Sequence, residues 1–515
     1  MQVPEVIPVS SDAAPPTGAR PCEEESSDVI GGTERDTGRD RIREIRERGD
    51  DPFGARFPRT HYAAEVRQGF KALEGHRVRV AGRLVGMRRM GGVAFADLLD
   101  RSGSVQLFLR SATMGAAAYG QLLADVDVGD FLGADGDVCR TRSGEVSVCA
   151  ASVKLLTKAL RPLPAKWHGL HDAEVRQRQR YLDLVANADV RQRFINRSRM
   201  MAAVRRYLDG HGYLEVETPV LHAVAGGAAA RPFKTHHNAL DLELHLRVAL
   251  ELHLKRLIVG GLDAVYEIGR VFRNEGLSTR HNPEFTMLEC YRAFADYTDM
   301  MDLTEGLFAA AAQEVCGTTQ LVWQGREIDL RGPWQRVSMI EALAALGLDP
   351  LGAPDEDAVH RLAAQAGVMV PPGATRGQVI DSMVDKLVLP QLLEPTFLID
   401  HPLAISPLAR ARPEEPRIAL RFEAIIGGME MANAFTELND PDEQRQRFVE
   451  QIKERDAGNE EAQLVDEDFL RALEHGMPPT GGLGVGLDRL AMLLCDVQSI
   501  RDVILFPLLR PRIRP

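Results

Sequence analysis

The chain has 515 residues, of which 44% are hydrophobic and 26% are charged. These proportions exclude a fibrous repeat and a largely disordered chain, and the length predicts two to four domains at about 100–200 residues each. The net charge of −12 excludes a protein that coats nucleic acid over its whole surface, but it allows a local basic groove.

No window approaches the roughly 18 consecutive apolar residues of a membrane span, and the opening MQVPEVIPVSSDAAPP lacks a basic region followed by an apolar one. We therefore expect a cytoplasmic protein. The cysteines show neither C-x-x-C spacing nor a nearby histidine, which predicts reduced, mostly buried thiols and no zinc site. They are Cys22, Cys139, Cys149, Cys290, Cys316 and Cys495.

The first 60 residues predict a flexible tail and a short N-terminal helix. Residues 1–50 are rich in Pro, Glu, Asp, Ser and Arg and poor in large apolar side chains, so they bury too little surface to order themselves. A charged helix is expected near Arg39–Arg48.

Residues 61–162 predict an OB-fold barrel. Five β-type runs lie between Val78 and Leu156, and turn signals such as Gly91-Gly92 separate them. A helix expected at Met114–Ala124 falls between the third and fourth runs, which is the OB-fold order. Such barrels often bind single-stranded nucleic acid, but the fold alone does not assign a function.

A linker is expected at residues 163–174, and an α+β domain at 175–515 with an insertion at about 320–415. Its strands follow one another too closely for repeated βαβ crossovers, which predicts a mainly antiparallel sheet. The expected strands are Tyr213–Val220, Ala264–Arg273, Phe285–Ala293, Arg417–Ile426 and Met429–Leu438. The expected helices are Val175–Leu184, Val190–Leu208, Glu251–Val259, Asp302–Val315, Asp442–Arg455 and Leu487–Leu494.

The first polar segment of this domain, residues 271–291, predicts a strand, a polar turn and a second strand. Alternation places Arg273 and Glu275 on one face of the first strand. The second strand presents on one face Phe285, Met287, Glu289 and Tyr291. The pair forms either a ligand surface or an ordinary sheet surface with salt bridges.

The second segment, residues 421–438, predicts a hairpin that turns at Gly427-Gly428. The turn brings Glu423 and Glu430 together, and two close carboxylates favour a shared proton or a divalent cation such as Mg²⁺. Glu430 has the opposite parity to the period-2 residues Asn433, Phe435 and Glu437, which predicts a twist or bulge. Two exposed glutamates on an ordinary hairpin are the alternative.

The third segment, residues 481–494, predicts a glycine-rich turn that opens a helix with Arg489 in its first turns. Glycines permit close approach to a ligand, and a helix N-terminus favours an anion. The spacing matches no dinucleotide fingerprint, and the sequence contains no P-loop. A simple helix-packing turn remains the alternative.

Together the three segments resemble motifs 2 and 3 and the metal site of class II aminoacyl-tRNA synthetases, and residues 213–219 (YLEVETP) resemble motif 1, with Pro219. Within that class the chain resembles lysyl-tRNA synthetases from about Arg39 onward, in strings such as RQRYLDL, FRNEG, HNPEFTMLE, NAFTELNDP and GGLGVGLDRL. The resemblance implies an OB-fold anticodon domain followed by a class II catalytic domain. It further implies that ATP and L-lysine form a lysyl-adenylate, that lysine passes to the 3′ end of tRNA(Lys), that Mg²⁺ is the cofactor, and that motif 1 forms a homodimer.

The resemblance also implies residue roles. The catalytic residues would be Arg273, which bridges the α-phosphate and the amino-acid carboxylate, and Arg489. ATP would contact Arg273, Glu275, His281, Asn282, Phe285, Glu430, Gly486 and Arg489, and the metal would bind Glu423 and Glu430. Lysine would contact Gly226, Gly227, Glu251, Glu289, Tyr291, Asn433, Phe435 and Glu437, a set whose acids suit two ammonium groups.

In the barrel, the resemblance assigns anticodon contacts to Arg88, Phe95, Gln106 and Glu145, with base stacking on Phe95. Core filling is the alternative for Phe95. One departure from the family pattern is Leu250, which replaces a proline beside Glu251 and would loosen the approach to the lysine pocket. Two other functions stay open: a paralogue that attaches lysine or β-lysine to a translation factor, and a nonenzymatic tRNA-binding protein.

Overall fold

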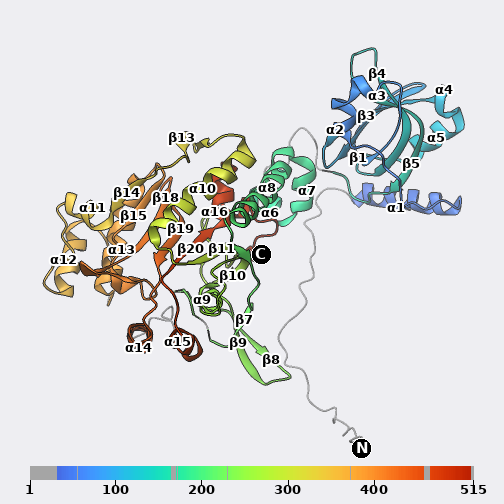
Figure 1. Cartoon of the computed structure of the whole chain (residues 1–515). Coiled ribbons are helices and arrows are strands. Elements are labelled where there is room, and N and C mark those ends of the chain that lie inside the picture. The colour runs from blue at the N-terminus through green and yellow to red at the C-terminus, as the bar shows by residue number, and fades with distance from the viewer. Residues whose placement is uncertain are drawn as a thin grey trace, which may run out of the picture. The chain divides into compact units, whose positions relative to one another are not determined.

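The computed structural model describes residues 32–511, apart from residues 55, 164–169, 171, 225, 229, 372 and 457–463. The chain divides into two compact units, residues 1–167 and 168–515 (Figure 1). Most of the expected linker and the tail before residue 32 lie outside the described residues. No helix in the described part is long and apolar enough to cross a membrane.

The first unit contains a closed five-stranded barrel in the order β1-β2-β3-β5-β4, with two helices between β3 and β4. This confirms the OB-fold prediction. The strands are β1 (Arg77–Met90), β2 (Val93–Asp100), β3 (Gly103–Arg110), β4 (Phe131–Arg140) and β5 (Val146–Thr157). The helices are α1 (Gly32–Glu47), α2 (Ala63–Gln68), α3 (Phe70–Leu73), α4 (Ser111–Met114) and α5 (Ala116–Asp125).

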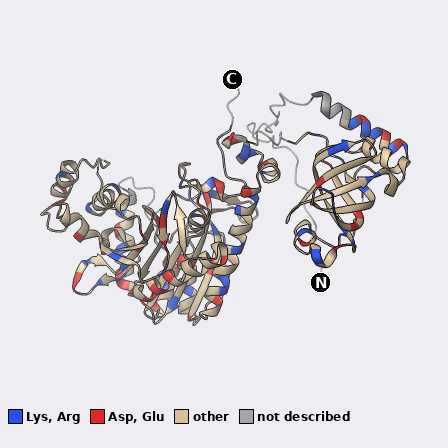
Figure 2. Cartoon of the chain, turned by 90° about the horizontal axis from the view of Figure 1, so that it is seen from above, with Lys and Arg blue, Asp and Glu red and all other residues tan. Residues whose placement is uncertain are grey.

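Helix α1 begins earlier than the charged helix expected near Arg39–Arg48, and acidic and basic side chains are interspersed along it (Figure 2). It is fixed to the barrel because Ile42 and Ile45 are buried and Arg48 pairs with Asp125 at 2.7 Å. The helix is therefore part of the first unit's fold.

The expectation of reduced, mostly buried thiols is wrong for at least three cysteines. Cys139 and Cys149 form a disulfide, because β4 and β5 pair as a hairpin and their Cα atoms lie 6.0 Å apart. Cys316 is exposed, whereas Cys290 is buried as expected. Cys22 lies outside the described residues.

In the second unit, the described residues form an eight-stranded sheet in the order β14-β15-β18-β19-β20-β11-β10-β6. It is antiparallel except at the pairs β14–β15 and β6–β10, as the close spacing of the strands predicted. Its strands are β6 (Leu214–Glu215), β10 (Ala264–Phe272), β11 (Glu284–Ala293), β14 (Gln335–Ser338), β15 (Thr396–Ile399), β18 (Arg421–Ile426), β19 (Met429–Thr436) and β20 (Thr480–Gly486). Smaller sheets hold β7 (Leu221–His222), β8 (Lys234–His237), β9 (Leu242–Leu246), β12 (Gln320–Trp323), β13 (Arg326–Asp329), β16 (Ala411–Arg412) and β17 (Glu415–Ala419).

The two faces of the sheet carry different helices (Figure 1). Helices α8, α10 and α16 pack on one face around a core that includes Leu288, Leu483 and Phe308. Helices α9, α14 and α15 lie over part of the other face, where Tyr291 joins a second core. The helices are α6 (Ala173–Arg178), α7 (Arg180–Ala186), α8 (Ala188–Gly210), α9 (Glu251–Val259), α10 (Tyr297–Cys316), α11 (Met339–Ala345), α12 (Glu356–Gln365), α13 (Arg376–Leu387), α14 (Pro441–Asp456), α15 (Glu467–Glu474) and α16 (Leu487–Leu494).

Several expected elements differ from the observed ones. The expected strand Tyr213–Val220 is only the two-residue β6, and the expected strand Arg417–Ile426 is divided into β17 and β18. The glycine-rich segment after residue 480 is not a turn but the strand β20, paired with β19 and β11. The stretch 320–415, expected as an insertion, supplies β14 and β15 to the sheet.

Candidate active site

A cavity of about 200 Å³ lies over β11, β19 and β20. Its lining includes every residue to which the sequence assigned a nucleotide contact, and these come from the loop before β11, from β11 and β19, and from the start of α16. They are Arg273, Glu275, His281, Asn282, Phe285, Glu430, Gly486 and Arg489. The fold therefore brings together three segments that are up to about 200 residues apart.

Arg273 and Phe285 form one wall of this cavity. The Arg273 guanidinium lies over the Phe285 ring, 5.2 Å from its centroid, and its Nε donates to the Val248 carbonyl at 3.4 Å. Strand β10 ends at Phe272, so Arg273 and Glu275 do not share a strand face as expected. They line the cavity from the loop after the strand.

Arg489 is the cation at the other side of the cavity. Its Nη1 donates to the Glu430 carbonyl at 2.6 Å and to Glu430 Oε2 at 3.0 Å, and Nη2 lies 3.5 Å from His281 Nε2. Burial alone would raise the pKa of Glu430, but Arg489, Arg421 and Arg273 lower it, so this carboxylate is ionised.

Glu423 is the second carboxylate of the hairpin, and Arg421 Nη2 donates to it at 2.6 Å. Burial and the nearby acids Glu430, Asp381 and Asp385 together raise its pKa to about 8, against the opposing charge of Arg421. The predicted bulge is present, because the register shifts between Ala424 and Ile425 opposite β19. The glutamates are therefore not ordinary exposed side chains.

These two carboxylates fit a hard divalent cation. Mg²⁺ is usually bound by one or two carboxylates together with substrate phosphates, and a cation would stabilise the ionised form of the partly buried Glu423. Among the described residues, no group of three or more His, Cys, Asp or Glu side chains converges on a metal-sized site. A cation here would thus need ligands from water and substrate as well as from protein.

Beside the nucleotide cavity, β11 carries the buried carboxylate of Glu289. It accepts hydrogen bonds from the Leu250 backbone N–H at 2.9 Å and from the Tyr291 hydroxyl at 3.1 Å. Burial and the charge of Glu251 together raise the pKa of Glu289 to about 7, against the opposing effect of these two donors. The Leu250 side chain is fully buried, so its N–H and its packing both hold this wall of the pocket.

Glu251 and Glu437 complete a group of three buried acids. Burial raises the pKa of both carboxylates, although the neighbouring Lys255 opposes the rise. Lys255 Nζ lies 2.5 Å from Glu251 Oε1 and forms an ion pair with Glu437. Within the described part of the chain, Glu437 Oε1 has no hydrogen-bond partner. An unpaired buried acceptor is costly, so this pocket is suited to a hydrogen-bond donor or cation from outside the chain.

Glycines shape the pocket. Gly227 has φ +90°, and a Cβ there would lie 3.3 Å from the Glu251 Cβ, which places the predicted Gly226-Gly227 pair beside Glu251. A Cβ on Gly482 of β20 would clash with Glu437 Oε1 and with the Tyr291 ring. Gly482 and Lys255 belong to this site, although neither was assigned to it from the sequence.

Asn433 and Phe435, the remaining predicted lysine contacts, lie on β19. Asn433 Nδ2 is 3.3 Å from Glu423 Oε1, and Asn433 also lines the nucleotide cavity. The Phe435 ring centroid lies 5.8 Å from Lys255 Nζ. The buried acids Glu251, Glu289 and Glu437 thus form one cluster with Tyr291, which we term the acidic pocket, and Gly227 and Phe435 lie beside it. Asn433 lies at the nucleotide cavity instead.

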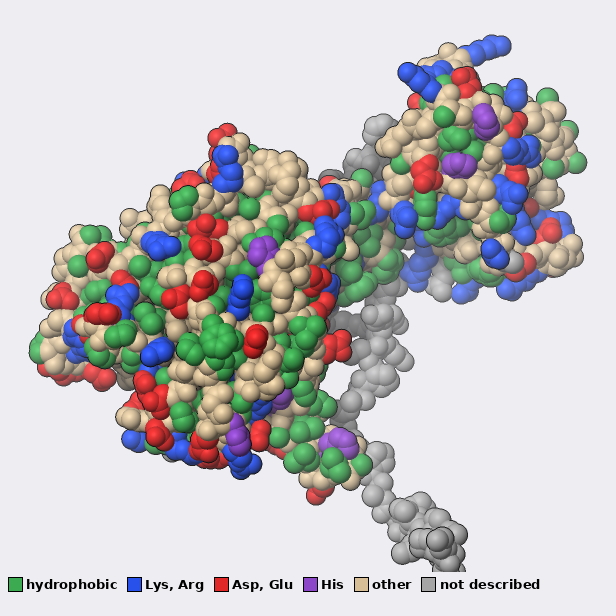
Figure 3. Space-filling view, in the orientation of Figure 1, with side chains coloured by type: hydrophobic (Ala, Val, Ile, Leu, Met, Phe, Trp, Pro, Cys, Tyr) green, Lys and Arg blue, Asp and Glu red, His purple; other side chains and the backbone are tan. Residues whose placement is uncertain are grey.

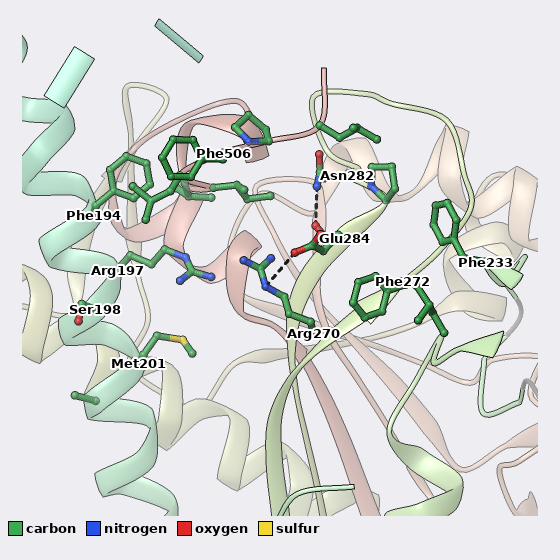
Figure 4. A pocket seen from close by; sticks show the side chains of 18 of the residues that line it. Phe194, Arg197, Ser198, Met201, Phe233, Arg270, Phe272, Asn282, Glu284 and Phe506 are labelled. Atoms are coloured by element: carbon green, nitrogen blue, oxygen red, sulfur yellow. Dashed lines mark hydrogen bonds and ion pairs between the residues drawn. The ribbon is translucent and has the colours of Figure 1, made fainter. Parts of the chain in front are cut away.

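A larger cavity, about 1040 Å³, lies between α8, the β10–β11 pair and residues 503–508 (Figure 4). Phe194 of α8 and Phe506 of the C-terminal segment face it, and Arg270 pairs with Glu284 at 3.7 Å. Among the described residues, Asn282 is the one that lines both cavities. The paired carboxylates Glu423 and Glu430 are absent from its lining, so volume alone does not identify the chemical site.

In the barrel, Phe95 faces outward, because Ala94, Ala96 and Leu98 of the same strand fill the core. Its ring stacks on Phe108 at 5.0 Å and 8°, so core filling is the wrong interpretation of Phe95. Phe108 was missed, although it is two residues from Gln106 on β3. On the same surface, exposed Arg88 is paired in register with Phe95.

Gln106 is buried, and its Oε1 accepts from the Ser147 hydroxyl at 2.9 Å. Glu145 is exposed at the β4–β5 turn. Acidic and basic side chains are interspersed on the face shown in Figure 3. This mixed surface agrees with the expectation that the protein does not coat nucleic acid over its whole surface. A local site is the form that such binding would take.

Two family models match the chain. Residues 172–510 match tRNA synthetases class II (D, K and N), and residues 78–156 match the OB-fold nucleic acid binding domain. The chain is 53% identical to the lysine–tRNA ligase of Moorella thermoacetica over 474 residues, which cover 92% of this chain and 97% of that protein. It is 50% identical to the lysine–tRNA ligase of Pelotomaculum thermopropionicum over 505 residues, with 96% and 100% covered. It is 53% identical to that of Bacillus subtilis over 482 residues, with 92% and 96% covered.

Proposed function

The chain belongs to the class II tRNA synthetases (D, K and N), and from this premise we propose that it is a lysine–tRNA ligase. It activates L-lysine with ATP to lysyl-adenylate and pyrophosphate, and then transfers lysine to the 3′ end of tRNA(Lys) with release of AMP. The observation that carries the proposal is the group of three buried acids, Glu251, Glu289 and Glu437, beside the nucleotide cavity.

The acidic pocket explains the choice of amino acid. Lysine brings two ammonium groups, and three carboxylates in a desolvated site bind such a ligand strongly, whereas aspartate would be repelled and asparagine would leave the acids unpaired. Glu251 and the Gly226-Gly227 backbone are assigned to the α-ammonium. Glu289 and Tyr291 are assigned to the ε-ammonium.

Adenylate formation requires the lysine carboxylate to attack the α-phosphate of ATP. Two anions must approach in line, so the reaction needs charge neutralisation and positioning more than a general base. We assign Arg273 to both reacting anions, since it lies between the nucleotide cavity and the acidic pocket, and Phe285 to stacking on the adenine. Arg489 is assigned to the phosphate end, together with Gly486 at the start of α16.

Glu423 and Glu430 are the residues that would hold Mg²⁺. When bound, the ion would neutralise phosphate charge and orient the departing pyrophosphate. Arg421 holds Glu423 and Arg489 holds Glu430, so both carboxylates are oriented by the chain itself.

We further propose that the barrel reads the anticodon. The stacked pair Phe95 and Phe108 offers a flat aromatic surface for a splayed base, with Arg88 beside it for phosphate. Gln106 and Glu145 supply polar contacts. This assigns residues 61–162 to anticodon binding and residues 175–515 to catalysis. We also propose that the protein works in the cytoplasm.

A homodimer is proposed from the resemblance of residues 213–219 to motif 1, and an exposed apolar surface beside α8 supports it. The segment that borders the larger cavity exposes Phe506 (71%) and Leu508 (57%), and α8 contributes Phe194 to the same surface (Figure 4). Contiguous exposed apolar side chains favour burial against a partner. Light scattering of the purified protein should give twice the chain mass.

Lysine-dependent exchange of labelled pyrophosphate into ATP tests the activation step, and charging of purified tRNA(Lys) tests the transfer. We expect both. Exchange without charging would instead support the paralogue that modifies a translation factor, and tRNA binding without exchange would support a nonenzymatic protein.

A further inference from the structure

A lysine of the chain itself lies inside the acidic pocket. Lys255 is fully buried, its Nζ lies 2.5 Å from Glu251 Oε1, and it also forms an ion pair with Glu437. We infer that Lys255 is a positioning residue, which sets the charge of the amino-acid pocket and holds Glu251 and Glu437 ready for the two ammonium groups of the substrate. This inference rests on the proposed function.

The position of Lys255 follows from local structure. Glu251 and Lys255 are four residues apart on α9, so they lie on the same face of the helix. Glu437 directly follows β19, and the Phe435 ring centroid lies 5.8 Å from the ammonium. A helix and a strand that are far apart in the sequence therefore place one cation between two carboxylates.

The charge balance gives this cation a function. With lysine bound, three ionised carboxylates would carry a charge of −3, and Lys255 would reduce the total to −2, which balances the +2 charge of the two substrate ammonium groups. Without Lys255, the third carboxylate would be buried and uncompensated, and such groups take up a proton. A protonated acid no longer attracts an ammonium, so lysine binding would weaken.

Other charged or titratable groups also face the pocket. Glu289 and Tyr291 lie on β11, Arg421 on β18 is close enough to act on Glu251, and Arg273 acts on Glu289. Arg273 lines the nucleotide cavity, and Arg421 pairs with Glu423. Lys255 is the cation in direct contact with Glu251 and Glu437 in the described part of the chain.

A purely structural role is the competing explanation, in which Lys255 only fixes α9 to the sheet. That role would affect folding, and it would change the KM values of lysine and ATP together. The charge role predicts an effect on lysine alone, and it predicts that the effect depends on pH. The two explanations can therefore be separated.

The test compares the full-length wild type with Lys255→Met in lysine-dependent pyrophosphate exchange. The charge role predicts that Lys255→Met raises the KM for lysine at least about tenfold, leaves the KM for ATP within about twofold, and shifts the acidic limb of the lysine profile to higher pH. Equal changes in both KM values, or an unchanged pH profile, would overturn the inference. If the wild type itself shows no exchange with lysine, the proposed function fails instead.

Chemical rescue gives a second measurement. In Lys255→Ala, added ethylammonium should restore the KM for lysine, whereas ethanol at the same concentration should not, with wild type in the same solutions as control. Rescue by both or by neither would contradict the charge role.

If Lys255→Met does not fold, Lys255→Arg replaces it. This variant keeps the cation and should keep the wild-type pH profile, and a shifted profile would overturn the inference.

Discussion

Substitution of Leu250 by proline tests the amino-acid pocket through one backbone hydrogen bond. The Leu250 N–H donates to Glu289 Oε1 at 2.9 Å, and proline has no N–H to donate. The resemblance to lysyl enzymes makes proline acceptable at this position, and the site precedes α9 as its N-cap. The substitution removes a donor from Glu289, and it also shifts the backbone locally, because Leu250 has φ −102° and proline holds φ near about −65°.

The expected change in the KM for lysine follows from the change in the pKa of the Glu289 carboxylate. A hydrogen bond to a charged group contributes about 1.5–3 kcal/mol, and about 1.4 kcal/mol corresponds to one pKa unit. Loss of the donor should therefore raise the pKa of Glu289 from about 7 by about one unit. At about pH 7.5 the ionised fraction would fall from roughly three quarters to roughly one quarter.

Steady-state pyrophosphate exchange measures the consequence. The KM for lysine in Leu250→Pro should rise about threefold at about pH 7.5 and return to nearly the control value at about pH 9, where Glu289 is ionised in both proteins. The KM for ATP should not change.

Leu250→Ala is the matched control, because it keeps the N–H and removes the buried side chain. It should lower the free energy of unfolding by about 2–5 kcal/mol while keeping the wild-type pH profile for lysine. If the proline and alanine variants show the same pH profile, the hydrogen bond to Glu289 has no role in lysine binding.

Four further predictions address other parts of the site. Glu289→Gln should lower kcat/KM for lysine far more than for ATP in exchange assays, and equal losses would refute its assignment to an ammonium group. Lysine binding between roughly pH 6 and 8 should release protons, because burial raises the pKa of Glu289 to about 7 and a bound ammonium lowers that pKa again. Calorimetry in buffers of different ionisation enthalpy measures the proton release, and a binding enthalpy that does not depend on the buffer would contradict the prediction. Glu423→Gln and Glu430→Gln should each raise the Mg²⁺ concentration needed for half-maximal exchange, and an unchanged requirement would count against a paired-carboxylate site. Phe95→Ala and Phe108→Ala should weaken tRNA binding by about 1–3 kcal/mol each without affecting exchange, and a parallel loss of exchange would show that they act on folding.

Local patterns predicted the helices that frame the site. The expected bounds of α9 and α16 agree with the structure, because each helix has an apolar periodicity, and α9 also ends at a glycine, Gly260. Period-2 alternation also placed Phe285, Glu289 and Tyr291 correctly on β11. These are properties of neighbouring residues, which a sequence displays directly.

Long-range pairing explains most of what the sequence did not show. Residues 480–486 contain four glycines, which disfavour a strand in isolation, yet β20 is paired on both sides and needs glycine where Glu437 and Tyr291 approach it. The Cys139–Cys149 bond required the β4–β5 register, although the short separation of 10 residues between the two cysteines was a usable signal.

Lys255 was missed for a physical reason. A lysine on an amphipathic helix is normally exposed, and only the approach of Glu437 from β19 makes burial of its charge favourable. Spacing to Glu251 suggests an ordinary helical ion pair. The third partner, which turns that pair into part of a pocket, is 182 residues further along the chain.

A crystal structure of the protein with L-lysine and a non-hydrolysable ATP analogue tests the central claim most directly. We predict the lysine ammonium groups against Glu251, Glu289 and Glu437, its carboxylate on Arg273, and the adenine on Phe285. Electron density for lysine or nucleotide elsewhere in the protein, with no ligand bound at these acids, would contradict the account.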